Sequence, residues 1–310
     1  MSKSNAKSDD KYTTRDGRVF LSGNQALVRL LVEQARRDRE VGLKTGGFVS
    51  GYRGSPLGHL DQDLAGARKL LEANSVRFQP GVNEDLAVTA IWGSQQTGFH
   101  PTRYDGVFGM YYSKGPGVDR SGDALRHANL WGTSPHGGVV MAVGDDPMSR
   151  SSSIQQQSEQ MLAGLSIPVF HAANVQDIYD FGLIGWQLSR YAGVWVAVKA
   201  VSDIFESWYA IDPDRTVTRP VIPADHVIAA PGVHTRWPDR SVDQDERMLT
   251  RRLPAVAAFA RANRLDRVSH ASPNRRLGIV TTGKSWSDTV EAFADLGLSD
   301  ARLAELGVEI

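Results

Sequence analysis

The segment from Thr45 to Asn74, TGGFVSGYRGSPLGHLDQDLAGARKLLEAN, carries the pattern on which the predicted fold depends. It begins as a short apolar strand, passes through a glycine-rich turn, and resumes apolar residues at helical spacing after Gly58. The same order recurs along the chain, in VRFQPGV with NEDLAVTAIWGSQQTG, in YDGVFGM with its following loop and helix, and in GGVVMAVGDDP, IPVFHAAN and VWVAVKAVSD. Such alternation predicts an α/β fold, a parallel sheet with helices on both faces.

Composition narrows the possible functions. The chain has 310 residues, and its 35 Lys and Arg balance 35 Asp and Glu, so no overall charge would hold it to nucleic acid or an anionic membrane. It has no cysteine, which excludes disulfides, thiolate zinc sites and iron–sulfur ligation within this chain. The N-terminus is polar, and no apolar run reaches the roughly 18 residues of a membrane span. We expect a cytoplasmic protein with no nucleic-acid or membrane partner.

Four parts are predicted along the chain. Residues 1–15 form a disordered tail, and residues 16–215 form the α/β domain. Residues 216–275 form a proline-rich linker or arm with one helix, adjusted at Pro254. Residues 276–310 begin a second α/β domain that is truncated, because one strand and helix cannot bury both faces of a parallel sheet.

The sequence GIVTTGKS, from Gly278 to Ser285, matches the phosphate-loop pattern G-x-x-x-x-G-K-[ST]. With VVMAVGDD as a magnesium-binding partner, it suggests an ATP-binding protein. The β-forming residues after Gly278 instead predict that this glycine lies inside a strand, with Gly283 making the turn and Ser285 capping a helix. The second interpretation is preferred, and the first is kept as an alternative.

Glu84 is the strongest candidate for a functional side chain. It follows Asn83, which can cap a helix, so the carboxylate falls in the first turn beside a loop. Capping alone also explains an acidic residue there. The residues by themselves leave both interpretations open.

Two glycine-rich loops, GYRGSPLG and YYSKGPGVDRSGD, follow predicted strands and are expected to share one rim of the sheet. Their glycines, among them Gly54, Gly115 and Gly117, allow the backbone to approach a ligand closely. Their cations suit an anionic group of a substrate; they are Arg53, Lys114 and Arg120.

Five stretches together closely resemble the indolepyruvate ferredoxin oxidoreductase family in its long fused bacterial form: GFVSGYRGSPLG, FQPGVNEDLAVTAIWGSQQ, YDGVFGMYYSKGPGVDRSGDALRHAN, GGVVMAVGDD and RLGIVTTGKSWSDTVEAFADLG. These are thiamine-diphosphate-dependent 2-oxoacid:ferredoxin oxidoreductases, and the resemblance extends from about Asp16 to Ile310. It implies that residues 16–215 are the pyrimidine-binding domain and that residues 276–310 begin a domain like the C-terminal domain of transketolase.

The resemblance also implies roles for individual residues. Glu84 matches the glutamate that hydrogen-bonds a ring nitrogen of the cofactor's aminopyrimidine, and Ser55 matches a hydroxyl near cofactor and substrate. Asn83, Gly54, Gly115 and Gly117 would line the cofactor, whereas Arg53, Lys114 and Arg120 would contact the substrate or a facing domain. The implied reaction is oxidative decarboxylation of an aryl 2-oxo acid to an acyl-CoA, with electrons passed through iron–sulfur clusters to ferredoxin.

This chain lacks two parts of the family pattern: the G-D-G motif that holds Mg²⁺ and the diphosphate, and the cysteines for iron–sulfur clusters. We expect a fragment without turnover on its own, whose missing domains come from the same polypeptide or another chain, with a homodimer also possible. Three hypotheses follow: a half-site of the oxidoreductase, an ATP-binding protein, or a non-catalytic remnant that serves as an interaction module.

Overall fold

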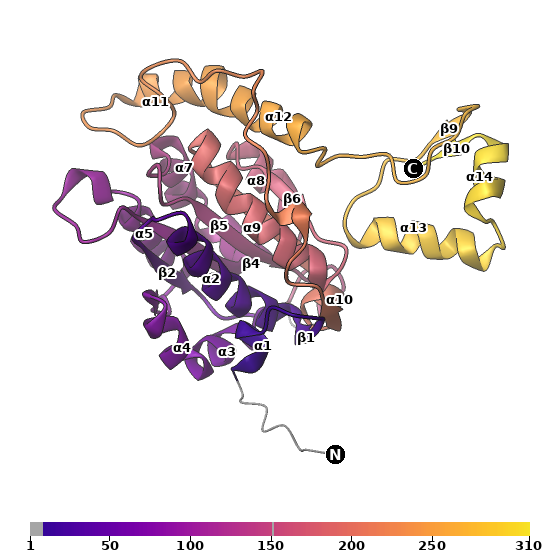
Figure 1. The fold of residues 1–310 in the computed structure, drawn as a ribbon, viewed down its shortest axis with the longest axis horizontal. Coiled ribbons are helices and arrows are strands. Elements are labelled where there is room, and N and C mark those ends of the chain that lie inside the picture. The colour runs from indigo at the N-terminus through magenta and orange to yellow at the C-terminus, as the bar shows by residue number, and fades with distance from the viewer. Residues whose placement is uncertain (1–8, 151) are drawn as a thin grey trace.

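Six parallel strands form the central sheet, in the order β3, β2, β4, β5, β7, β6 (Figure 1). The computed structural model describes residues 9–150 and 152–310. The strands are β2 (Thr45–Gly51), β3 (Val76–Phe78), β4 (Gly106–Lys114), β5 (Val139–Asp145), β6 (Val169–His171) and β7 (Trp195–Val201), and all neighbours run parallel. The predicted parallel α/β sheet is confirmed.

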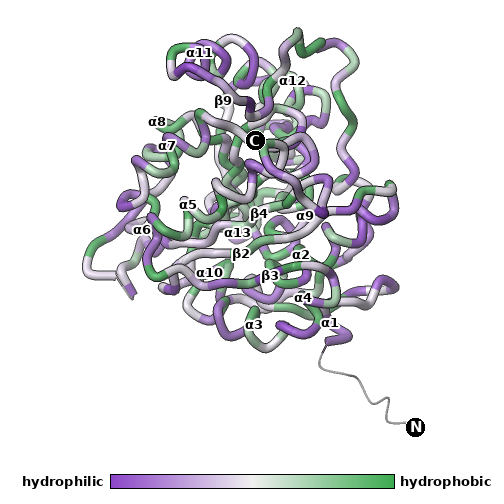
Figure 2. The backbone as a smooth tube through the Cα atoms, turned by 90° about the vertical axis from the view of Figure 1, so that its left-hand side faces the viewer, coloured by the Kyte–Doolittle hydropathy of each residue, from purple (hydrophilic) through white to green (hydrophobic). Residues whose placement is uncertain are grey.

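The sheet is covered on both faces because alternate residues of its central strands enter two separate cores. In β5, Val140 and Ala142 belong to one core, whereas Val139, Met141 and Val143 belong to the other. The first core is covered by α2 (Gly23–Glu40), α3 (Leu60–Gly66), α4 (Arg68–Ala73) and α9 (Val175–Ala192). The second is covered by α5 (Glu84–Ser94), α6 (Gly115–Arg120), α7 (Gly122–Trp131) and α8 (Glu159–Gly164). Figure 2 shows these two layers on opposite sides of the strands.

Local signals set the helix boundaries in most cases. Ser22 caps α2 in a reciprocal capping box with Gln25, so the helix starts at Gly23. The single helix expected from His59 to Asn74 is divided into α3 and α4 at Ala67. Gly66 lies at this break, and glycine is a poor helix former.

The segment 1–15, predicted to be a disordered tail, contains a short helix. Residues 1–8 of the predicted disordered tail lie outside the described residues, but α1 (Asp10–Thr13) packs on the domain and buries Tyr12. Arg29 of α2 secures it by donating a hydrogen bond to the Lys11 carbonyl at 2.6 Å. The chain then enters β1 (Val19–Ser22), which pairs antiparallel with β8 (Trp208–Ile211) beyond the short helix α10 (Ser202–Phe205).

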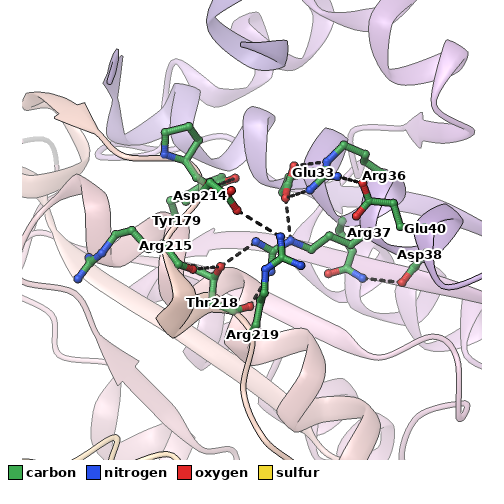
Figure 3. Close-up of polar contacts among 12 residues, drawn as sticks. Glu33, Arg36, Arg37, Asp38, Glu40, Tyr179, Asp214, Arg215, Thr218 and Arg219 are labelled. Carbon is green, nitrogen blue, oxygen red and sulfur yellow. Dashed lines mark hydrogen bonds and ion pairs between the residues drawn. The ribbon is translucent and has the colours of Figure 1, made fainter. Parts of the chain in front are cut away.

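The segment after β8 is tied to α2, as Figure 3 shows. Two guanidinium nitrogens of Arg37 donate to Thr218, one to its carbonyl at 2.6 Å and one to its hydroxyl at 2.7 Å. Glu33 of α2 accepts a hydrogen bond from Arg37 Nε at 2.7 Å and also pairs with Arg36. The Arg37 guanidinium is therefore held by Glu33 on one side and by Thr218 on the other. Thr218 lies in the 3₁₀ turn Thr216–Thr218 and is fully buried, which anchors the start of the predicted linker.

A helical arm completes the part of the linker that packs on the domain. It consists of α11 (Ser241–Arg247), a π-helical turn (Met248–Arg252) and α12 (Leu253–Ala262), so the helix is irregular just before Pro254, as predicted. Arg252 is fully buried, and its guanidinium donates to four backbone carbonyls, those of Val233, Asn129, Leu130 and Trp131. The last three end α7, where carbonyls have no partner within the helix.

The C-terminal unit lies to one side of the sheet, beyond an extended segment (Figure 1). It contains β9 (Leu277–Gly278), α13 (Lys284–Asp295), α14 (Asp300–Leu306) and β10 (Val308–Glu309), and its two strands pair in parallel. None of the residues of α13 is buried. The division into four parts stays a prediction.

Candidate functional site

The candidate site lies at the carboxyl edge of the sheet, where open parallel α/β sheets bind their ligands. The loop from Tyr52 to Gly58 follows β2, α5 follows β3 after a short connection, and α6 follows β4 directly. The predicted site residues lie on these three segments, at the N-cap of α5 (Asn83) or at the last residue of β4 (Lys114). The sheet order places β2 between β3 and β4, so the three segments are neighbours at one edge.

Glu84 is the first residue of α5, and its side chain turns inward. The cap itself is supplied by Asn83, whose side-chain oxygen accepts a hydrogen bond from Leu86 N at 2.9 Å. The side chain of Glu84 is only 11% exposed, whereas that of the adjoining Asp85 is 42% exposed. Helix capping does not require a buried carboxylate, so this burial favours a further role for Glu84.

Gly117 is the close neighbour of Glu84. A Cβ atom at position 117 would lie 2.7 Å from Glu84 Cγ, 2.9 Å from Glu84 Oε1 and 1.9 Å from Ser113 Oγ. Two further hydroxyls lie beside them: Tyr111 and Ser121 are hydrogen-bonded at 3.2 Å, and Ser121 donates to the Gly117 carbonyl. Burial raises the pKa of Tyr111 well above its ordinary value, so its hydroxyl stays neutral.

Ser113, Tyr111 and Ser121 were not identified from the sequence. Their hydroxyls are buried side by side only because β4 runs directly into α6, which folds back over the strand end. The available signal was the run of hydroxyl residues YYS before the second glycine-rich loop. The three hydroxyls form a buried polar cluster next to the Glu84 side chain.

Arg120, at the end of α6, meets the two acidic residues of α5. Its Nε donates to Asp85 Oδ2 at 3.2 Å and lies 3.7 Å from Glu84 Oε2. The Arg120 side chain is 57% exposed, so it lies on the solvent side of the nearly buried Glu84. Arg120 therefore contacts carboxylates of this chain.

Lys114 lies in the same group of loops with a different environment. Its side chain crosses Gly54, since a Cβ atom at Gly54 would be 3.0 Å from Lys114 Cδ, and its ammonium donates to Ser152 Oγ at 3.5 Å. Among the described residues, Lys114 forms no ion pair within 4 Å, and its ammonium contacts a hydroxyl instead. Lys114 is thus half-buried and available to an anion.

Ser55 and Arg53 occupy the loop after β2. Ser55 Oγ donates to Glu206 Oε1 at 3.3 Å, which links the loop to the end of α10. Arg53 is exposed beside it. The structure therefore brings Glu84, Asn83, Gly117 and Arg120 together, with Gly54 and Lys114 alongside them and Ser55 directed to α10.

Asp145, at the end of β5, was a candidate magnesium ligand in the ATP-binding interpretation. It is buried, pairs with Lys199 of β7 at 3.1 Å, and accepts hydrogen bonds from the backbone and hydroxyl of Ser158. Lys199 also pairs with Glu159. A Cβ atom at Gly115 would be 3.0 Å from Asp145 Oδ1, so the ion pairs of Lys199 with Asp145 and Glu159 lie directly beside the second glycine-rich loop. Lys199 was not predicted from the sequence as part of the site.

The phosphate-loop match does not form a wrapped loop. Gly278 lies in β9, as predicted, and the residues up to Thr282 continue without a helical or hydrogen-bonded turn. Gly283 makes the turn with φ +57°, also as predicted, but it is itself the N-cap residue, so Ser285 lies within α13 and the predicted Ser285 cap is wrong. Lys284 pairs with Asp288 at 2.6 Å in the first turns of α13.

Among residues 9–150 and 152–310, no three His, Cys, Asp or Glu side chains are grouped so that they could hold a metal ion. Within the same ranges, no helix combines the length and apolar character needed to cross a membrane.

Comparison with solved structures supports the class of fold. The structure is similar to a 2-oxoglutarate:ferredoxin oxidoreductase from Magnetococcus marinus, with a TM-score of 0.61 and 14% sequence identity, over 94% of this chain and 53% of that one. At this identity the likeness concerns the fold. No family model matches the chain.

Comparison with curated proteins adds sequence relatives. The chain is 22% identical to the indolepyruvate oxidoreductase subunit IorA of Methanothermobacter thermautotrophicus over 297 residues, which cover 94% of this chain and 43% of the relative. The IorA subunit of Pyrococcus abyssi is 25% identical over 186 residues, covering 60% of this chain and 25% of the relative. The resemblance found in the sequence is confirmed, and the relatives are oxidoreductase subunits. The chain spans less than half the length of these relatives.

Proposed function

We propose that this chain supplies the pyrimidine-binding half of a thiamine diphosphate site in an indolepyruvate, or aryl 2-oxo acid, ferredoxin oxidoreductase. The observation that carries the proposal is the nearly buried Glu84 carboxylate at the carboxyl edge of the sheet, packed against Gly117. The similarity to IorA subunits over 94% of the chain supports the reaction class.

The residues around Glu84 fit the proposed cofactor. Gly117 has no Cβ atom, so its side of the Glu84 carboxylate is not filled by a side chain. A Cβ atom there would collide with Glu84. A carboxyl group beside a glycine backbone, which a ligand can approach closely, is suited to hydrogen-bond a ring nitrogen of the aminopyrimidine. When bound, thiamine diphosphate supplies the electron sink for decarboxylation of a 2-oxo acid.

Each residue has a distinct task in this proposal. Asn83 fixes the first turn of α5, and Glu84 holds or exchanges a proton at the ring nitrogen. Gly54, Gly115 and Gly117 let the backbone approach the cofactor, and Ser55 would offer a hydroxyl beside it in place of its hydrogen bond to Glu206. Lys114 is the better placed cation for a substrate carboxylate because it has no carboxylate partner among the described residues, and Arg53 is a second, more exposed one.

The remaining parts of the reaction require other domains. We propose that a diphosphate-binding domain provides the Mg²⁺ site and that an iron–sulfur domain passes electrons to ferredoxin, with coenzyme A as acyl acceptor. This division is supported by the lack of cysteine and of a G-D-G motif in this sequence. It also agrees with the greater length of the IorA relatives. We place the complete enzyme in the cytoplasm.

The test combines this chain with the missing domains and measures reduction of ferredoxin by indolepyruvate and coenzyme A. Glu84→Gln should abolish reduction and weaken thiamine diphosphate binding in calorimetry. Glu72→Gln is the matched control, because Glu72 is exposed on α4 and pairs only with Arg68 among its described contacts. Full activity in Glu84→Gln would contradict the proposal. Mg-ATP binding that is lost in Lys284→Ala would support the ATP-binding alternative instead.

A further inference from the structure

Arg120 and the two acidic residues at the start of α5 form a compact group whose geometry differs from that of the other cations nearby. The guanidinium lies 3.2 Å from Asp85 and 3.7 Å from Glu84, whereas Lys114 has no carboxylate within 4 Å in the described part of the chain. Asp85 makes the shorter contact, with a hydrogen bond, so it anchors Arg120. A cation already paired in this way is poorly placed to receive a substrate carboxylate.

The two oxygens of Glu84 have different neighbours. Oε1 would lie 2.9 Å from a Cβ atom at Gly117, and Oε2 lies 3.7 Å from Arg120 Nε. Gly117 and Arg120, which constrain the Glu84 side chain by close packing and by charge, both belong to α6, whereas Glu84 is the first residue of α5. Glu84 and Asp85 lie at the N-terminus of α5, where the backbone N–H groups are free, and their adjacent carboxylates repel each other. The Arg120 cation beside them therefore favours one defined arrangement of the two side chains.

We propose that Arg120, anchored by Asp85, is a positioning residue that orients the Glu84 carboxylate for its hydrogen bond to the cofactor ring nitrogen. The inference rests on the proposed function for the identity of the ligand. It assigns Arg120 to Glu84 rather than to the substrate or a facing domain. Arg120 itself touches neither reacting atom, so its effect must pass through Glu84.

The contact can be tested without any cofactor, in the unfolding of the full chain by urea. Arg120→Gln, Glu84→Gln and the double variant form a double-mutant cycle. For a partly exposed pair we expect a coupling of about two- to fivefold in the unfolding equilibrium constant. Arg120→Lys should keep part of this coupling, since it retains the charge without the planar fork. Additive effects of the two substitutions would overturn the inference whatever the function of the chain.

The functional role is tested by thiamine diphosphate binding with Mg²⁺ to the assembly that contains the diphosphate-binding half. Arg120→Gln should weaken binding about three- to fivefold. It should have no effect on an analogue that carries C–H in place of the ring nitrogen facing Glu84. Arg126→Gln, an exposed arginine on α7, makes the same charge change as a control.

The outcomes separate the two levels of the argument. If Glu84→Gln weakens cofactor binding and Arg120→Gln does not, the role of Arg120 is wrong and the proposed function stands. If Arg120→Gln weakens binding of cofactor and analogue equally, Arg120 acts by general charge and the positioning role is overturned. If neither variant changes cofactor binding, the proposed function itself fails.

Discussion

Gly117→Ala is the substitution for which the structure makes the sharpest prediction. Gly117 lies in α6, where its backbone suits any residue, so only the space around the new Cβ atom matters. That atom would lie 1.9 Å from Ser113 Oγ, 2.7 Å from Glu84 Cγ and 2.9 Å from Glu84 Oε1. Both neighbours are side chains, so the expected response is rotation of Ser113 and displacement of Glu84.

Two opposing effects set the change in stability. Alanine is favoured over glycine inside a helix by about 1 kcal/mol, while overpacking of a filled site costs about 1–3 kcal/mol. The free energy of unfolding should therefore fall by no more than about 2 kcal/mol. The effect on function is larger, because displacement of Glu84 removes a charged hydrogen bond of about 1.5–3 kcal/mol, or about 10- to 100-fold in cofactor affinity.

Urea unfolding and calorimetric binding of thiamine diphosphate measure the two effects separately. The matched control is Gly93→Ala in α5, the helix of Glu84, where a Cβ atom would have nothing within 4 Å. It should leave cofactor affinity unchanged and raise stability by up to about 1 kcal/mol. Unchanged cofactor affinity in Gly117→Ala would refute the idea that Gly117 keeps Glu84 in place.

Three other predictions concern stability. Arg252→Met should lower the free energy of unfolding by about 3 kcal/mol in urea titrations, because it leaves four backbone carbonyls without their donor; Arg251→Met, at an exposed neighbour, should stay within about 0.5 kcal/mol. Burial raises the pKa of Asp180 to about 6, so the folded chain holds this proton more tightly than the unfolded chain. Its contribution to stability should therefore decline as the pH rises from about 4 to about 6, and Asp180→Asn should remove that part of the pH slope. Lys284→Ala should change stability by less than about 0.5 kcal/mol, because it removes only the partly exposed pair with Asp288; a loss of several kcal/mol would show an unrecognised role.

Much of the architecture could be predicted because its signals are local. Apolar runs such as Val139–Val143 alternate with helical patterns, and a strand buried on both faces has to be apolar throughout. The capping of α5 by Asn83 and of α2 by Ser22 depends on residues no more than three positions apart. Prediction failed where competing local preferences were nearly equal, as in the division at Ala67 and in the cap of α13, which is Gly283 and not Ser285.

The fold class, the glycine-rich loops and Glu84 as the leading candidate could all be inferred from the sequence, because each is encoded within a short stretch. The groups that surround the Glu84 carboxylate are known only from the three-dimensional fold. Gly117 and Arg120 reach Glu84 from the helix that follows a different strand, and Lys199 reaches Asp145 from a third. These contacts join residues more than 30 positions apart, and the order of strands in the sheet brings them together. No periodicity or spacing along the chain encodes that order.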